Sequence, residues 1–298
     1  MVSGVGRVLV IGNGVVVTPA LRRTLGSGAF SDEVVIAATR SPAEVRSALA
    51  DGAVTAAVCV SSAMVYGAWP DNALPLTEDA AVRPNPGFAV ANTLAEIERI
   101  AREWRDDGDG RTLAVLRPAT VLGPDEPDAV ARVLAGVVPV RVLGDSPPAQ
   151  YVDRDDVVEA VRVAVAKRLD GVFNVAPPGW IGGEEVEALR GDRRRVRLPA
   201  RVLRMVGRAF ARNRAASVSA ELVPYLLHPW VVANDRLVGA GWRSRHSNEE
   251  VLVTALEGRV PRELGARQRQ HLSLGIAAAV GAGLVAGAVV LVRRRRRS

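Results

Sequence analysis

The apolar segment 53–62 ends in a hydroxyl-bearing side chain, Ser62. A serine hydroxyl can hold a substrate oxygen, but proton transfer near neutral pH needs a further group. One such group is a tyrosine four residues before a lysine, because both then lie on one helix face and the ammonium lowers the phenol's pKa from about 10. The only lysine in the chain is Lys167, and no tyrosine precedes it by four residues. The sequence therefore lacks this proton-transfer pair.

Metal and disulfide chemistry find no support in the sequence. The single cysteine, Cys59, excludes an internal disulfide and a cysteine-based zinc site, and its apolar surroundings predict a buried thiol. The three histidines, His228, His246 and His271, show no ligand spacing. We therefore predict no metal site.

The elements that must position Ser62 alternate between strand and helix. Apolar, strand-like segments lie at 7–14, 32–40, 53–62, 111–124 and 171–176, with helix-like segments at 18–25, 41–50, 85–98 and 153–169 between them. Ser41 followed by Pro42 is typical of an N-cap and first helical turn. Strands that are apolar throughout are expected in a parallel sheet covered on both faces. The pattern predicts an α/β fold with a doubly wound parallel sheet.

Several segments resemble, in order and spacing, the NAD-dependent epimerase/dehydratase family of extended short-chain dehydrogenases. They are VCVSSAMVYG (58–67), PLTEDAAVRPNPGFAVANTLAEIE (75–98), LRPATVLGP (116–124) and VRVLGDSPPAQYVDRDDVVEAV (140–161), followed by FNVA and NDRLVGAGWRSRHSNEEVL (234–252). The resemblance covers about residues 5–255. It implies a Rossmann-type fold, an NAD or NADP cofactor, and a nucleotide sugar or related hydroxyl compound as substrate.

The resemblance places the family's catalytic residues on three positions. Ser62 matches the catalytic serine, while Phe88 and Asn92 stand where the family has tyrosine and lysine. A phenyl ring has no proton to exchange, and an amide is neutral, so an acid–base contribution of roughly 10²–10⁴-fold would be lost. Because phenylalanine keeps the volume of tyrosine, the helix can still pack.

The cofactor loop also departs from the family pattern. Gly12 matches the first of three glycines, whereas Val15 and Thr18 occupy the other two places, and Asn13 and Gly14 complete only a partial G-x-G. Such a loop favours either a phosphate site at a helix N-terminus or a tight strand-to-helix turn alone.

Three further positions would touch a bound cofactor. Arg40 follows the second strand. It could bind the 2′-phosphate of NADP, or it could be an ordinary surface arginine. Pro118 and Thr120 belong to the segment that resembles the loop closing on the nicotinamide. Because only about 45 residues separate the first glycine from VCVSS, we expect a trimmed sheet and an incomplete cofactor pocket.

The chain divides into four expected regions. They are a Rossmann-like domain (1–178), a small C-terminal substrate lobe (179–265), a transmembrane helix (272–292) and a basic tail (293–298). Residues 272–292 carry no charge, and 21 helical residues at about 1.5 Å each cross a hydrocarbon layer of roughly 30 Å. The N-terminus runs into a strand without a signal-peptide pattern, so we expect a single-pass membrane protein with its main domain in the cytoplasm.

The positive charge has competing interpretations. Arg201, Arg204, Arg208 and Arg212 recur at near-helical spacing, which fits either a solvated helix face or contact with anionic lipid. The chain shows no nucleic-acid-binding module. Gly283 and Gly287 form a G-x-x-x-G pair that could bring two anchors together as a homodimer.

Three functions remain open on the sequence. The first is a membrane-anchored epimerase/dehydratase-like protein that binds NAD(P) or a nucleotide sugar. The second is a non-catalytic binding or scaffold protein on the same fold with no retained cofactor. The third is a different chemistry in the same cleft, with Asp153 or Glu96 as the base.

Overall fold

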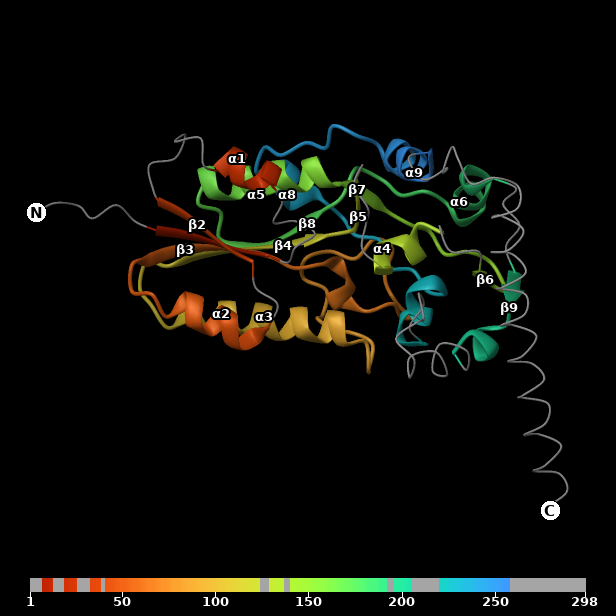
Figure 1. Ribbon diagram of the computed structural model, residues 1–298, viewed down its shortest axis with the longest axis horizontal. Coiled ribbons are helices and arrows are strands. Elements are labelled where there is room, and N and C mark those ends of the chain that lie inside the picture. The colour runs from red at the N-terminus through yellow and green to blue at the C-terminus, as the bar shows by residue number, and fades with distance from the viewer. Residues whose placement is uncertain are drawn as a thin grey trace, which may run out of the picture. The chain divides into compact units, whose positions relative to one another are not determined.

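The computed structural model (Figure 1) includes all five strands of the expected parallel sheet. The described residues are 7–12, 19–25, 33–38, 41–123, 129–136, 140–191, 196–204 and 220–257. The chain divides between residues 256 and 257 into two compact units, and all described residues except Glu257 belong to the first. The predicted boundary at residue 178 falls inside this unit.

Five parallel strands form the central sheet. They are β1 (Arg7–Gly12), β2 (Glu33–Ala38), β3 (Val54–Val60), β4 (Thr112–Pro118) and β8 (Gly171–Val175), in the order β2-β1-β3-β4-β8. The chain places β2 on one side of β1 and β3 on the other, so the sheet winds in both directions from that point. The predicted doubly wound parallel sheet is confirmed. A single helix, α2, separates β2 from β3 in the described chain.

Helices cover both faces of this sheet (Figure 1). The first pair is α1 (Pro19–Leu25) and α5 (Arg154–Ala166), and the second is α2 (Pro42–Leu49) and α3 (Ala89–Asp106). Alternate strand residues supply the two cores, because successive side chains of a strand point to opposite faces. Val8 and Val10 belong to the core beneath α1 and α5, whereas Leu9 and Ile11 belong to that beneath α2 and α3.

Local signals explain several element ends. Ser41 caps α2 as predicted, since its hydroxyl accepts a hydrogen bond from the Glu44 amide at 3.3 Å and Pro42 opens the helix. The strand predicted over 111–124 is instead divided at Pro118. Proline has no amide to extend the ladder, and the chain beyond it pairs elsewhere as β5 (Thr120–Leu122).

The remaining elements lie around the carboxyl end of the sheet, except α8, which packs beside β8 and α5. They are η1 (Ala63–Tyr66), α4 (Ala129–Leu134), β6 (Val140–Val142), β7 (Tyr151–Asp153), α6 (Gly183–Arg190), β9 (Val196–Leu198), η2 (Ala220–Leu226), α8 (Asp235–Gly239) and α9 (Asn248–Glu257). Two small parallel sheets join β5 with β7 and β6 with β9. Within the ranges given above, no helix is both long enough and apolar enough to cross a bilayer. Residues 272–292 and 293–298 lie outside those ranges, as does the predicted G-x-x-x-G pair.

Candidate functional site

The carboxyl ends of β1, β3 and β4 meet at one edge of the sheet. Ile11 pairs with Cys59, and Val60 pairs with Leu116, so the segments that leave these strands begin side by side. In doubly wound sheets, ligands bind outside the carboxyl ends of the strands, where the winding direction changes. Here that point lies between β1 and β3, and two serines follow β3 directly.

The two serines have different hydrogen-bonding environments. The Ser62 hydroxyl accepts from the Met64 amide at 3.2 Å, which caps η1, and donates to the Pro118 carbonyl at 3.5 Å. Ser61 donates its backbone amide to the Leu116 carbonyl at 2.8 Å. Its side chain is 7% exposed, and its hydroxyl oxygen is buried without a hydrogen-bond partner among the described residues. Ser61 therefore has a donor and acceptor to offer a ligand.

Both serines line an open hollow, called here the serine hollow, which measures about 640 Å³ when the adjoining open solvent is counted. Its described lining is Ser61, Ser62, Met64, Val90, Leu94, Pro118, Ala119, Thr120, Val121, Val130, Ala131, Leu134 and Trp230. Three of these side chains carry hydroxyls, and none of the described lining side chains is ionisable. The structure thus brings together three residues predicted separately as site residues, Ser62, Pro118 and Thr120.

Helix α3 contributes Val90 and Leu94 to this lining. The two are four residues apart and lie on one helix face. Glu98, a further turn along, forms a buried ion pair with Arg117 on β4. The ion pair fixes the rotation of α3 against β4, because both of its side chains are buried. Val90 and Leu94 consequently face the serines.

Phe88 and Asn92, which the sequence placed at the tyrosine and lysine positions, make contacts within the protein at the start of α3. Phe88 is 4% exposed and packs on Tyr225, with ring centroids 5.2 Å apart. Asn92 donates its side-chain amide to the carbonyls of Asn85 at 3.1 Å and Phe88 at 2.8 Å, so it stabilises the start of α3. Neither residue is among those that line the serine hollow.

The start of α3 explains this placement. The sequence predicted that the helix begins at Asn85 and Pro86, but α3 begins at Ala89. Asn85 is used differently: its buried side chain accepts from the Ala68 amide at 2.8 Å and donates to the Ala68 carbonyl at 3.2 Å. The chain then turns at Gly87, whose φ is +81°, a value that favours glycine.

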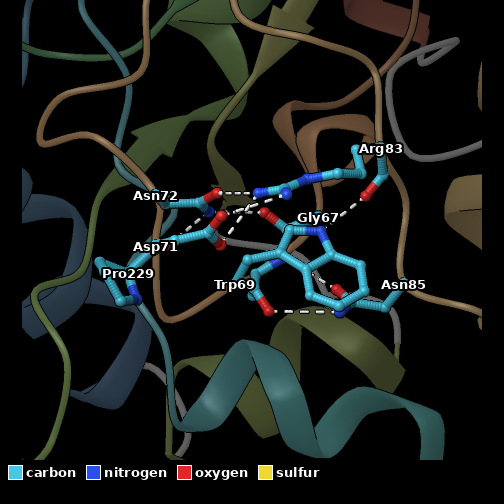
Figure 2. A network of polar contacts seen from close by, with 8 residues as sticks. Gly67, Trp69, Asp71, Asn72, Arg83, Asn85 and Pro229 are labelled. Atoms are coloured by element: carbon cyan, nitrogen blue, oxygen red, sulfur yellow. Dashed lines mark hydrogen bonds and ion pairs between the residues drawn. The ribbon is translucent and has the colours of Figure 1, made fainter.

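A polar network holds the loop before α3 in place, and Figure 2 shows its members close together. The Arg83 guanidinium pairs with Asp71 at 3.1 Å and lies over the Trp69 ring, 5.0 Å from the centroid. The Trp69 indole donates to the Arg83 carbonyl at 2.8 Å. Asn72 donates to the carbonyls of Gly67 at 2.9 Å and Pro229 at 2.8 Å. This network connects the end of η1 to the residue before Trp230, which lines the hollow.

The cofactor residues divide between described and undescribed parts of the chain. Gly12 ends β1 and pairs with Ala38 at the expected edge of the sheet. Asn13, Gly14 and Arg40 lie outside the described residues.

A neighbouring hollow of about 700 Å³ shares Thr120, Leu134 and Trp230 with the serine hollow. Its cation, Arg190, donates to the Leu134 carbonyl at 2.6 Å, and its guanidinium also contacts the Tyr151 hydroxyl at 3.2 Å. Burial raises the pKa of Tyr151 above its usual value despite the nearby arginine. The guanidinium of Arg190 is therefore already committed to groups of the protein.

The two alternative bases lie away from the serine hollow. Asp153 caps α5 and lines a separate hollow with His246 and Glu250, and burial raises its pKa. Glu96 pairs with Arg99, whose hydrogen bond lowers the pKa of that carboxyl. Across the described part of the chain, no cluster of acidic, histidine or cysteine side chains is suited to hold a metal ion.

Comparisons with known proteins place this geometry in a structural class. No family model matches the sequence, and no curated protein does. Solved structures do match: human epimerase family protein SDR39U1 with NADPH has a TM-score of 0.58 at 16% identity, covering 86% of this chain and 100% of its own. The UDP-glucose 4-epimerase of Thermus thermophilus with NAD gives 0.57 at 17% identity, covering 86% of this chain and 100% of its own.

A third matching structure contains both a sugar nucleotide and NAD. MoeE5 in complex with UDP-glucuronic acid and NAD gives a TM-score of 0.58 at 18% identity, covering 85% of this chain and 98% of its own. At such identities the likeness establishes the fold. The chain therefore has the Rossmann-type fold found in NAD(P)-dependent epimerases and dehydratases.

Proposed function

We propose that the protein is a non-catalytic relative of the NAD(P)-dependent epimerases and dehydratases, which binds a small molecule in the serine hollow. The observation that carries this proposal is the lining of that hollow. It keeps Ser62 but presents Val90 and Leu94 from the facing helix, and no described lining side chain is ionisable.

The register of the missing pair follows from α3. We infer that the tyrosine and lysine positions correspond to Val90 and Leu94, because these residues have the required spacing and lie toward Ser62. The sequence assignment to Phe88 and Asn92 is then displaced by two residues. Neither pair contains a phenol or an ammonium, so the acid–base step is missing in both registers.

Ser62 alone supports binding rather than turnover. Its hydroxyl can orient an oxygen of a ligand, but general acid–base catalysis needs a group whose pKa lies near the working pH. Asp153 and Glu96 line other parts of the surface and do not reach the serine hollow. The expected deficit is the roughly 10²–10⁴-fold that such a group contributes.

The described residues fit one end of NAD or NADP. Ser61, Pro118 and Thr120 offer hydroxyls and apolar surface, which match a flat nicotinamide ring with its carboxamide. When bound, the cofactor would supply a hydride acceptor, while these residues would orient it and exclude water. The neighbouring hollow would take the sugar of a nucleotide sugar in this scheme. The alternative is a scaffold with no retained cofactor.

We also propose that residues 272–292 anchor the protein in a membrane, with the unit 1–256 on the cytoplasmic side. The support is the sequence: the segment is uncharged over 21 residues and is followed by five arginines. Arginines on both sides of the segment give opposing orientation signals. Protease protection of the 1–256 unit in sealed vesicles would test the orientation.

The experiment that tests the proposal uses residues 1–265, which contain the whole compact unit 1–256 with all five of its described apolar clusters. Turnover is measured as the conversion of UDP-glucose, separated from its products by chromatography, with NAD⁺ or NADP⁺ present, because an epimerisation leaves no net reduced cofactor. Binding is measured as a fluorescence titration with NADH and NADPH. We expect no turnover above background.

The outcomes separate the alternatives. Turnover by the wild type that Ser62→Ala abolishes, with an unchanged melting curve, would contradict a non-catalytic protein. Micromolar binding of NADH without turnover would support a relative that retains its cofactor. Absence of binding to either dinucleotide would favour the scaffold with no cofactor.

A further inference from the structure

We propose that the ligand of the serine hollow is an uncharged, mostly apolar molecule that accepts a hydrogen bond from Ser61 through a single hydroxyl or carbonyl oxygen. This rests on the proposed function, because it names the class of molecule bound at the same site. It departs from the nucleotide sugars and dinucleotides present in the matching structures.

The first support is the unpartnered Ser61 hydroxyl. Ser61 is one of the residues that line the hollow, and its hydroxyl oxygen is buried without a hydrogen bond from any described residue. Ser62 beside it is already engaged with Met64 and Pro118. Buried polar groups in folded proteins are nearly always hydrogen-bonded. A ligand oxygen that accepts from Ser61 would supply the missing bond.

The second support is the apolar character of the walls. Ten of the thirteen described lining side chains carry no hydroxyl, and the only polar atom among these ten is the Trp230 indole nitrogen. That nitrogen donates to the Tyr225 carbonyl at 3.3 Å, so it is not available to a ligand. An apolar body with few hydrogen-bonding groups therefore suits the walls.

The third support is the missing countercharge. A phosphate or carboxylate in the hollow would meet no cation from the described lining, and Arg190 in the neighbouring hollow is committed to the Leu134 carbonyl and the Tyr151 hydroxyl. Burial of an ionised group without a partner is strongly unfavourable. The described lining thus favours a neutral ligand.

The fourth support is an exposed apolar side chain at the mouth. Val90 is 45% exposed, although it borders an apolar hollow. A ligand that fills the hollow would cover it, and burial of apolar area favours binding.

The test uses residues 1–265 and the neutral fluorophore Nile red as the probe, with twelve-carbon competitors that differ only in the head group. Dodecanol, dodecane, dodecanoate and NADH are compared for displacement of the probe. We expect dodecanol to displace it best, because only dodecanol combines the apolar chain with a neutral oxygen. Dodecanoate should be weaker because its carboxylate finds no cation.

Two variants connect the binding to the hollow. Ser61→Ala should weaken dodecanol about threefold to tenfold and leave dodecane unchanged, since it removes one hydrogen bond. Val90→Glu should weaken every uncharged competitor, because it puts a carboxylate at the mouth. Ser244→Ala and Thr93→Glu are matched controls, because neither residue lines the hollow. A melting curve for each variant confirms that it is folded.

Three results would overturn the proposal. They are failure of any neutral competitor to bind, equal loss of dodecanol and dodecane in Ser61→Ala, and displacement by NADH but not by dodecanol. The last result would assign the hollow to the dinucleotide and leave a non-catalytic binding protein intact. Turnover by the wild type would instead remove the proposed function, whichever competitor binds.

Discussion

Arg117 on β4 and Glu98 on α3 form a two-point ion pair in which both side chains are almost fully buried, 3% and 0% exposed. Arg117 donates through Nε at 3.1 Å and through Nη2 at 2.7 Å. Its guanidinium also lies over the Tyr66 ring, 4.6 Å from the centroid. Because Glu98 lies four and eight residues after Leu94 and Val90, the ion pair is on the side of α3 that carries these two residues toward the serines.

Loss of the Glu98 charge should therefore be costly. Glu98→Gln leaves the Arg117 guanidinium buried without its countercharge, and breaking a buried pair in this way costs about 3–5 kcal/mol. We expect the free energy of unfolding in urea to fall by that order. Glu103→Gln, on the same helix but with its side chain 55% exposed, is the control and should change it by less than about 1 kcal/mol. If the two changes lowered the free energy of unfolding equally, the buried ion pair would contribute no more to stability than an exposed one.

The proposed displacement of the tyrosine and lysine positions by two residues has its own test. Phe88→Tyr would put a phenolic hydroxyl into the apolar cluster around Tyr225, and an unpaired buried hydroxyl costs about 1–3 kcal/mol. Val90→Tyr puts the same group on a half-exposed position and should change the unfolding free energy by less than about 1 kcal/mol. Urea denaturation of both variants measures the difference. If Val90→Tyr were the more damaging change, the orientation of α3 described here would be incorrect.

Gly67, in the network of Figure 2, is predicted to tolerate no side chain. Its φ is +71°, and a Cβ there would lie against the Arg83 carbonyl oxygen and the Trp69 ring, far inside contact distance. Gly110→Ala is a matched control, because its φ is +73° with open space around it. The control should cost about 1–2 kcal/mol for the left-handed backbone alone.

Gly67→Ala should cost about 1–3 kcal/mol more than Gly110→Ala, since the clash forces nearby groups to move. Thermal or urea unfolding of the pair gives the difference directly. Equal losses would indicate that the loop before α3 moves aside freely. Because this loop connects η1 to Trp230, the Gly67 variant should also weaken binding in the serine hollow.

Asp170 provides a prediction on pH. Its hydrogen bond from Arg105 and that from the Leu113 amide at 3.0 Å hold the pKa of its carboxyl below the usual value. A carboxyl with a lowered folded-state pKa stabilises the fold above its unfolded pKa, near 4, and loses that stabilisation as the pH falls through the folded value. Asp170→Asn keeps an acceptor for the Leu113 amide but removes the charge.

The stability difference between wild type and Asp170→Asn should accordingly be constant at neutral pH and shrink as the pH falls below about 4. Urea unfolding at a series of pH values measures it. Asp107→Asn, an exposed acid near the end of α3, corrects for the change in net charge. A difference that persisted unchanged into acid would show that the charge of Asp170 is not the cause.

The sheet could be predicted from the sequence because its signals are local. Buried parallel strands are apolar at successive positions. Ser41 followed by Pro42 is a typical helix N-terminus, and it predicts the start of α2. The division at Pro118 was harder, because β4 and β5 are both apolar and only the absence of one amide separates them. β5 pairs with β7, Tyr151–Asp153, which is distant in the sequence. The residues around β5 therefore do not indicate which strand it pairs with.

The site could be predicted only in part for a related reason. Ser62, Pro118 and Thr120 follow strand ends, so the topology alone brings them to one edge. The rotation of α3 depends instead on Glu98 and Arg117, whose pairing is a long-range contact. A glutamate within the apolar stripe of Ile97, Ile100 and Ala101 is the available signal, since a buried acid needs a buried partner. The sequence could not single out the Ser61 hydroxyl. Its importance depends on the lack of a hydrogen-bond partner among the described residues, which only the three-dimensional structure shows.

Cys59 sits in the middle of the sheet on β3, fully buried beneath α2 and α3, and its burial raises the thiol pKa well above the ordinary value. Since the thiolate is the form that reacts with alkylating reagents, the native molecule should resist modification almost completely. It is also the only sulfhydryl in the chain. Alkylation of Cys59 therefore requires the centre of the sheet to open. The rate of alkylation consequently measures how often the native protein opens there.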